Sequence, residues 1–166
     1  VIADRGRHGG VRVEPSGVGS GSGGGDRTVT GLTGRPDGSA YAFTATAPAD
    51  PGELWWGEGG QERCLTSLNA AFRAEAGLVE PQAFTVLHDG VEIDAWAYLP
   101  PGEERVPLLL NIHGGPATQY GWGFFDEFQI YAGAGYGVVA CNPRGSSGRG
   151  RDFVRVPVGR WVEERP

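Results

Sequence analysis

The chain has 166 residues, a length that suits one domain or parts of two. It carries 20 acidic residues against 14 basic ones, and the net charge of −6 disfavours binding to nucleic acid through neutralised phosphates. No apolar stretch approaches the ~20 residues of a membrane-spanning helix, and no signal peptide is visible. These features predict a cytoplasmic protein with neither nucleic acid nor a membrane as its partner.

The two cysteines and the missing methionine carry two further expectations. Cys64 and Cys141 lie far apart and outside any CxxC spacing, so we expect buried free thiols and no metal, cofactor or disulfide framework. The chain begins at Val1 and contains no methionine. We therefore expect an internal fragment of a longer reading frame, for which the sequence indicates no oligomeric state.

The N-terminal residues predict one strand and a linker. A strand is expected at residues 8–13, and the Gly- and Ser-rich residues 15–26 predict a flexible linker. Residues 19–24 satisfy the pattern G-x-G-x-x-G. However, no apolar strand precedes them and no helical pattern follows, so the pattern does not indicate a dinucleotide site.

Residues 28–66 predict a meander of about four short strands. The strands are expected at 28–33, 40–46, 53–56 and 61–66, with turns between them. In the second strand, Tyr41, Phe43 and Ala45 share one face. Short strands separated by turns every 8–12 residues are typical of an all-β repeat such as a propeller blade.

A connector and a hairpin follow the meander. Residues 67–80 predict one helical turn, with Asn69 as its N-cap and Gly77 at its end. Beyond it, strands at 83–87 and 91–99 predict a hairpin. We expect His88, in the turn of that hairpin, to be solvated.

The last third of the chain predicts a strand–helix–strand unit. Residues 107–113 form an apolar run typical of a buried strand, and residues 124–132 show helical spacing of their apolar side chains. Residues 135–142 predict a second buried strand. Such a unit places its strands parallel with a right-handed crossover. Another helix is expected at residues 157–164.

The first predicted buried strand ends in His113-Gly114-Gly115-Pro116. Glycine lets the backbone turn sharply there and present an N–H to open space. In α/β-hydrolases a His-Gly-Gly segment at this place supplies one donor of the oxyanion hole. Gly115 is therefore the candidate catalytic residue, through its backbone amide. We expect His113 to be a structural hydrogen-bonding group, and Arg144, in the loop after the second strand, to orient neighbouring carbonyls or carboxylates.

An oxyanion hole requires a nucleophile, and the sequence offers none. In α/β-hydrolases the nucleophile lies in G-x-S-x-G, followed by an acidic residue and a histidine. No serine of the chain has glycine at both positions two residues away. No catalytic triad can be assembled by this rule.

Two motifs together resemble the prolyl oligopeptidase family of serine peptidases, most closely its acylaminoacyl-peptidase branch. They are the segment 113–116 and the pair 142–148 and 150–153. Residues 50–54, 65–69 and 84–93 resemble the family's last propeller blade and its entry into the hydrolase domain. Family members with this pattern usually have tyrosine where Arg149 stands.

The resemblance implies a β-propeller that restricts access and an α/β-hydrolase that cleaves short peptides by acyl transfer to serine. Residues 1–79 would then be the C-terminal part of the propeller. Residues 80–166 would be the N-terminal part of the hydrolase, truncated before the nucleophile. It also implies that Gly115 is an oxyanion donor, that the triad lies beyond Pro166, and that the chain alone is inactive. Short peptides are the expected substrate partners of the parent protein.

Two other interpretations stay open at this point. A carboxylesterase or lipase-like hydrolase shares the His-Gly-Gly segment, although the upstream meander argues against it. A non-catalytic β-repeat binding module with a vestigial βα tail belongs to a different class. Propeller blades encoded upstream of Val1 would separate the peptidase from the esterase.

Overall fold

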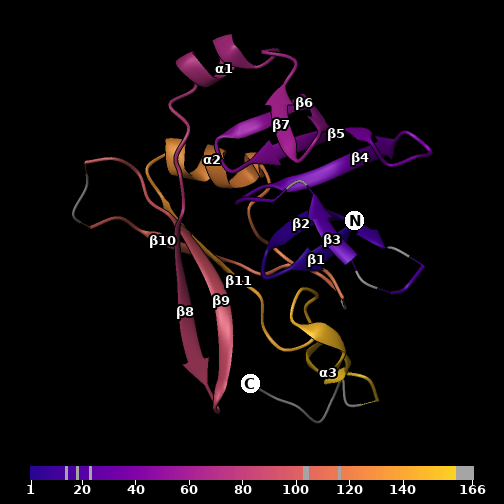
Figure 1. Ribbon diagram of the computed structural model, residues 1–166. Helices are drawn as coiled ribbons and strands as arrows, with labels where there is room; N and C mark the ends of the chain where they lie inside the picture. Colours follow the sequence, from indigo (N-terminus) through magenta and orange to yellow (C-terminus); the bar gives the residue numbers. More distant parts are fainter. Residues whose placement is uncertain (14, 18, 23, 103–104, 116, 160–166) are drawn as a thin grey trace.

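The computed structural model describes residues 1–13, 15–17, 19–22, 24–102, 105–115 and 117–159, and it contains two β-sheets (Figure 1). The first sheet holds the strands from β1 to β7 and the second holds those from β8 to β11. The helix α2, Asp126–Gly133, packs against β9 and β11 of the second sheet. Its Gln129 side chain also donates to the carbonyl of Pro48, in the turn between β5 and β6, at 3.0 Å. One helix therefore contacts both sheets.

The first sheet contains the predicted four-stranded meander. Its strands are β4 Thr28–Gly34, β5 Ala40–Ala47, β6 Asp50–Glu58 and β7 Gln61–Cys64, each antiparallel to the next. Phe43 and Ala45 of the predicted inward face are buried together with Val29, and Tyr41 packs against them. The period-two pattern of β5 was therefore interpreted correctly.

Three further strands extend this sheet beyond the meander. They are β1 Ile2–Asp4, β2 Arg7–Val13 and β3 Gly19–Ser22. The strand β2 contains the predicted strand 8–13, and it joins β4 in parallel. The prediction of a flexible linker at residues 15–26 is wrong for β3, which pairs antiparallel with β2. Composition did not reveal this strand because the ladder bonds come from the backbone and require no apolar side chain.

The helical turn of the connector is α1, Ala70–Glu75. Asn69 occupies the predicted N-cap position, but its side chain makes no capping bond and donates instead to the carbonyl of Gly52. The carboxylate of Glu53 accepts the backbone N–H groups of Leu68 and Asn69, each at 2.9 Å. Gly77, with φ of +58°, follows the helix end as predicted.

The second sheet has the order β10-β11-β9-β8. The predicted hairpin is β8 Gln82–His88 and β9 Val91–Tyr98, whose turn residues Asp89 and Gly90 both have positive φ. The strand–helix–strand unit is β10 Leu108–Asn111, α2 and β11 Gly137–Cys141, with β10 and β11 parallel as predicted. Because β11 is antiparallel to β9, the sheet is mixed.

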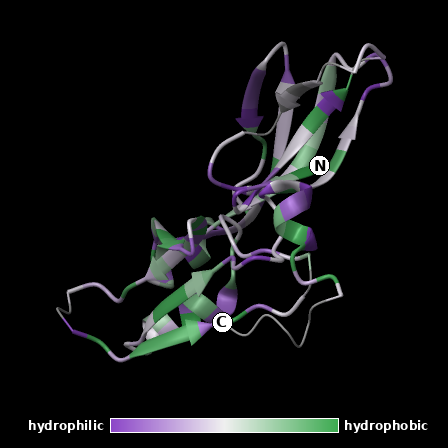
Figure 2. Cartoon of the chain, turned by 90° about the horizontal axis from the view of Figure 1, so that it is seen from below, coloured by the Kyte–Doolittle hydropathy of each residue, from purple (hydrophilic) through white to green (hydrophobic). Residues whose placement is uncertain are grey.

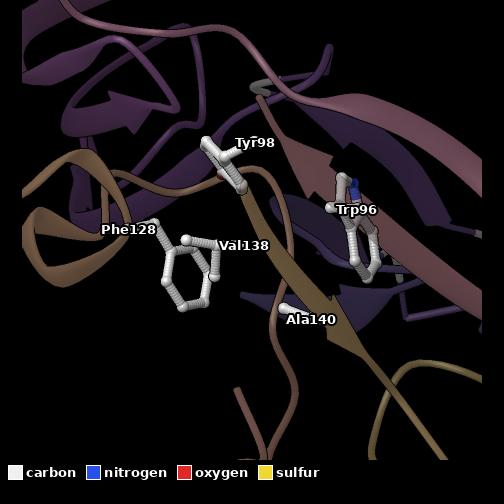
Figure 3. Close-up of a cluster of buried hydrophobic side chains, with 5 residues drawn as sticks. All are labelled: Trp96, Tyr98, Phe128, Val138 and Ala140. Atoms are coloured by element: carbon white, nitrogen blue, oxygen red, sulfur yellow. The ribbon is translucent and has the colours of Figure 1, made fainter. Parts of the chain in front are cut away.

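One face of the second sheet carries the core beneath α2. Phe128 of the helix lies against Val138 of β11 and Tyr98 of β9, and Trp96 and Ala140 complete the cluster (Figure 3). The register pairs Trp96 with Ala140 and Tyr98 with Val138, so these four side chains share one face. The predicted burial of the second strand of the unit is thus confirmed.

The other face of the second sheet is apolar and largely exposed. Cross-strand register places Leu108 and Leu110 of β10 on the same face as Phe84 and Val86 of β8. Leu110 is 60% exposed, and Ile112 beyond the strand is 75% exposed. The prediction of a buried strand at 107–113 is therefore wrong, because β10 is an edge strand whose Leu108 and Leu110 are each 60% exposed. In Figure 2 the strands beside the C mark carry broad hydrophobic colouring.

This exposed face predicts self-association of the isolated 166-residue chain. Contiguous apolar surface and an open strand edge both favour contacts between copies. We expect light scattering to show oligomers or aggregates, with strong binding of a hydrophobic dye. Replacing Leu108 and Leu110 with glutamine should reduce both signals. A monomer with a sharp cooperative melt would contradict this expectation.

The C-terminal helix and the cysteines differ from the predictions. The helix α3 spans Gly150–Arg155, earlier than the predicted helix at 157–164. Residues 157–159 form a turn, and the remainder of that prediction lies outside the described residues. Both cysteines are free, but Cys64 is exposed at the end of an edge strand, so its predicted burial is wrong. Among the described residues, no helix could span a membrane and no cluster of His, Cys, Asp or Glu could hold a metal ion.

Candidate active site

The candidate oxyanion loop follows directly from the end of β10. After Asn111 the chain leaves the sheet, and Gly115 lies four residues beyond that point on the surface. Within the part of the chain that the structure describes, no acceptor pairs with the Gly115 N–H. Pro116 lies outside the described residues.

His113 has both ring nitrogens engaged. Its Nδ1 lies 2.8 Å from the carbonyl oxygen of Gly114, and its Nε2 lies 3.0 Å from Oγ of Ser146. A carbonyl oxygen only accepts, so Nδ1 carries the proton and Nε2 accepts from the serine hydroxyl. The ring edge also packs on Tyr120, with centroids 5.1 Å apart. These contacts make His113 the structural hydrogen-bonding group that the sequence predicted.

The pairing of Ser146 with His113 has the distance of a nucleophile and its base, but its surroundings differ. Ser146 is only 1% exposed. The second nitrogen of His113 faces a carbonyl, whereas a catalytic histidine is oriented by a carboxylate in the usual triad. The Ser146–His113 bond therefore joins two loops, and the contact at Nδ1 differs from that of a triad histidine.

Two loops are held together by backbone and amide bonds. Ala117 N–H donates to Gly145 O at 3.1 Å, and Ser147 N–H donates to Thr118 O at 2.9 Å. Asn142, which is buried, accepts from the N–H of Tyr120 at 2.8 Å through Oδ1 and donates to the Tyr120 carbonyl at 2.9 Å through Nδ2. The loop after β11 therefore fixes the loop that carries Gly115.

A pocket of about 180 Å³ lies between these loops. It is lined by His113, Gly114, Gly115, Pro143, Arg144, Gly145, Ser146 and Pro157. Arg144 lines this pocket, and its guanidinium lies 3.8 Å from Oδ2 of Asp89. This separation is longer than a hydrogen bond, so the orienting role expected for Arg144 stays a prediction. Gly115 thus borders a small space between the two loops.

Sequence reasoning missed a charged cluster centred on Asp94. Its carboxylate accepts from Nε and Nη2 of Arg149, both at 2.7 Å, and from Nη2 of Arg5 at 2.8 Å. Asp94 is 7% exposed and shares the inward face of β9 with Trp96 and Tyr98. A carboxylate at an inward position of a strand was the available signal, because such a group needs a charged partner.

The cluster makes stability depend on pH through Asp94. Burial raises the pKa of this carboxyl, but hydrogen bonds from Arg149 and Arg5 outweigh burial and leave the pKa below its ordinary value. A lowered folded-state pKa stabilises the fold above the unfolded-state pKa of about 4, and this stabilisation is lost as the pH falls toward the folded-state value. The difference in melting temperature between wild type and Asp94→Asn should therefore be largest at neutral pH. A difference that stays constant from pH 7 to pH 3 would contradict this prediction.

The comparisons with known proteins point to peptidases. The chain is 41% identical over 131 residues to the uncharacterized peptidase YuxL of Bacillus subtilis, an alignment that covers 76% of this chain and 20% of the relative. It is 43% identical over 57 residues to dipeptidyl aminopeptidase BIII of Pseudoxanthomonas mexicana, over 34% of this chain and 8% of the relative.

Solved structures agree with these relatives. The acylaminoacyl peptidase of Pyrococcus horikoshii superposes with a TM-score of 0.81 at 29% identity, over 90% of this chain and 24% of that one. An acylaminoacyl peptidase in complex with Z-Gly-Gly-Phe-chloromethyl ketone gives a TM-score of 0.86 at 28% identity, over 95% of this chain and 25% of that one. The class defined by these similarities is that of peptidases.

One further match names a family. Residues 122–164 match the model of the prolyl oligopeptidase family. Together with the relatives and structures above, this match shows that the chain is similar to the prolyl oligopeptidase family of peptidases. The chain spans a fifth of the Bacillus relative and about a quarter of the two solved structures.

Proposed function

We propose that the chain supplies the oxyanion-binding part of a serine peptidase that hydrolyses short or N-acylated peptides by acyl transfer to serine. The observation that carries this proposal is the exposed Gly115 amide, which has no acceptor among the described residues and borders a pocket between two fixed loops. The match of residues 122–164 to the prolyl oligopeptidase family supports it.

The chemistry follows from the position of that amide. When a serine attacks a peptide carbonyl, negative charge develops on the carbonyl oxygen. An N–H already aimed at that oxygen stabilises the transition state without reorganisation at the moment of reaction. The bonds of His113 to Gly114 O and to Ser146 restrict the loop on which Gly115 lies. The contribution of these residues is preorganised electrostatic stabilisation.

The nucleophile and its partners are proposed to come from a longer protein. No serine of the chain lies in G-x-S-x-G, and the buried Ser146 is engaged with His113. We assign residues 1–79 to a propeller domain and residues 80–166 to the first part of a hydrolase domain. The change from the first sheet to the second, between β7 and β8, supports that division. On this proposal the 166-residue chain alone is a catalytically silent fragment of a cytoplasmic enzyme.

A fluorophosphonate probe, which reacts with activated serines, tests the proposal. We expect covalent labelling of the protein expressed from the full reading frame and no labelling of the 166-residue chain. The same full-length enzyme, without the probe, should also release p-nitroaniline from short N-acetylated or free aminoacyl p-nitroanilides. Labelling of the chain alone would contradict the proposed division of the active site. A full-length protein that cleaves esters and no peptide amides would contradict the peptidase assignment.

A further inference from the structure

The turn between β1 and β2 is inserted between the two loops that form the candidate site. Arg5 and Gly6 both have positive φ, +44° and +81°. Arg5 N–H donates to Gly148 O at 3.0 Å, and Gly6 O accepts from Trp122 N–H at 2.8 Å. A turn of the first sheet is thereby bonded to both loops of the second half of the chain. We call this two-residue element the Arg5–Gly6 turn.

Three glycines make the close approach possible. A Cβ on Gly6 would lie 2.6 Å from Cη2 of Trp96 and 2.9 Å from Cα of Gly121. A Cβ on Gly121 would overlap the carbonyl group of Gly6, and one on Gly148 would lie 2.9 Å from the Arg5 nitrogen. Backbone meets backbone at this contact, which leaves no room for side chains.

Gln119 recognises the backbone of the turn through both ends of its carboxamide. Its Oε1 accepts from Gly6 N–H at 3.2 Å, and its Nε2 donates to Arg7 O at 3.1 Å. The backbone groups on the other side of Gln119 hold the loops together, since Thr118 O accepts from Ser147 N–H. The turn and the loop bearing Gly115 therefore share the same short segment.

The Asp94 cluster fastens the turn by charge. Asp94 binds Arg5 of the turn and Arg149 at the end of the loop that follows β11. Glu92 adds a second carboxylate, 3.5 Å from Arg5 and 3.4 Å from Arg149. Because Asp94 is nearly buried, loss of either arginine leaves a buried charge with half of its partners.

We propose that the Arg5–Gly6 turn, fastened by Asp94 and Arg149, positions the Gly115 amide for catalysis. This inference rests on the proposed serine peptidase function. Arg5, Asp94 and Arg149 touch neither the pocket nor Gly115, and they act as positioning residues through the bonds Ala117 N–Gly145 O and Ser147 N–Thr118 O. The first sheet would thus set the geometry of the oxyanion site in addition to flanking it.

The full-length enzyme carrying Arg149→Ala, Arg5→Ala or Asp94→Asn tests this proposal. A displacement of about 1 Å at a reacting group costs up to ~10²-fold in rate, so we expect kcat to fall about 10- to 100-fold. We expect KM to change less than about threefold, because ground-state contacts of the substrate are untouched. A peptide trifluoromethyl ketone adds the catalytic serine to its carbonyl, and the oxyanion of the resulting hemiketal occupies the site. Affinity for this ketone should therefore fall in parallel with kcat/KM.

Matched controls separate positioning from folding. Arg73→Ala removes an ion pair of similar length, 2.7 Å to Asp50, in which neither loop takes part, and should leave kcat unchanged. Titration with the fluorophosphonate counts active sites, so kcat is expressed per competent enzyme. If Arg149→Ala does not fold, the Arg5→Ala variant tests the proposal instead. The Arg5 side chain is 45% exposed, so its removal should disturb folding less.

The outcomes distinguish the two proposals. Wild-type full-length enzyme that neither hydrolyses peptides nor reacts with the probe overturns the proposed function. Active wild type, with cluster variants that match Arg73→Ala in kcat and in ketone affinity, overturns the positioning role alone. A fall in kcat with unchanged ketone affinity also overturns it, because the oxyanion site would then be intact.

Discussion

Replacing Gly115 with proline should lower kcat/KM of the full-length enzyme by about 10²- to 10³-fold, the cost measured for removal of one oxyanion-hole donor. Proline has no backbone N–H, so the substitution deletes the one group that the proposed mechanism uses. Gly115 does not have a left-handed φ, a backbone conformation that proline cannot adopt. The loss should fall mainly on kcat, since the hydrogen bond strengthens as charge develops on the oxygen.

Gly115→Ala is the matched control for this prediction. A Cβ at this position would lie 3.6 Å from the Ala117 nitrogen and 4.0 Å from Cγ2 of Thr118, ordinary van der Waals distances. Alanine retains the N–H, so kcat/KM should stay within a few-fold of wild type. The measurement is steady-state hydrolysis of an N-acylated p-nitroanilide, corrected by active-site titration. Equal activity of the proline and alanine variants would remove Gly115 from the mechanism.

The sequence predicted the parts of the fold that depend on local patterns. The alternation in β5, the turn at Asp89-Gly90 and the helical spacing in α2 each arise from residues close together in the chain. Each is set by backbone geometry and by which face is apolar, and both are visible in a short window. The parallel pairing of β10 with β11 followed from the strand–helix–strand order.

The errors in the fold have a common physical origin. The apolar run ending in β10 carries the pattern of a buried strand, but burial depends on which elements cover both faces. The strand β3 has almost no apolar pattern and is formed by backbone pairing with β2. Neither property is encoded within the segment that shows it.

The candidate site was predicted in part for a similar reason. Gly115 and His113 lie in one local motif, so the sequence located them directly. Asp94, Arg149 and Arg5 are separated by 55 and 89 positions along the chain, and only the fold brings them together. Asp94 alternates with Trp96 and Tyr98 on the inward face of β9, and a carboxylate there needs a cationic partner. The alternation did not indicate which arginine would be that partner.

Replacing Gly121 with alanine should destabilise the protein by roughly 2–4 kcal/mol. The new Cβ would overlap the carbonyl group of Gly6, which is backbone and cannot rotate away as a side chain could. The Arg5–Gly6 turn would have to retreat, with loss of the bond from Trp122 N–H to Gly6 O. Urea unfolding followed by tryptophan fluorescence would measure the change, since Trp96 and Trp122 lie at this contact.

Gly133→Ala provides the comparison for this variant. Gly133 ends α2 and, like Gly121, has no left-handed φ. Apart from its own helix and its chain neighbours, no described residue would come within 4 Å of a Cβ added at Gly133. Alanine there should be neutral or should stabilise by up to about 1 kcal/mol. Similar unfolding midpoints for the two variants would show that the Arg5–Gly6 turn does not pack closely against Gly121. If Gly121→Ala is destabilised as expected, the folded fraction should also lose kcat, because the same retreat releases the segment that holds the Gly115 loop.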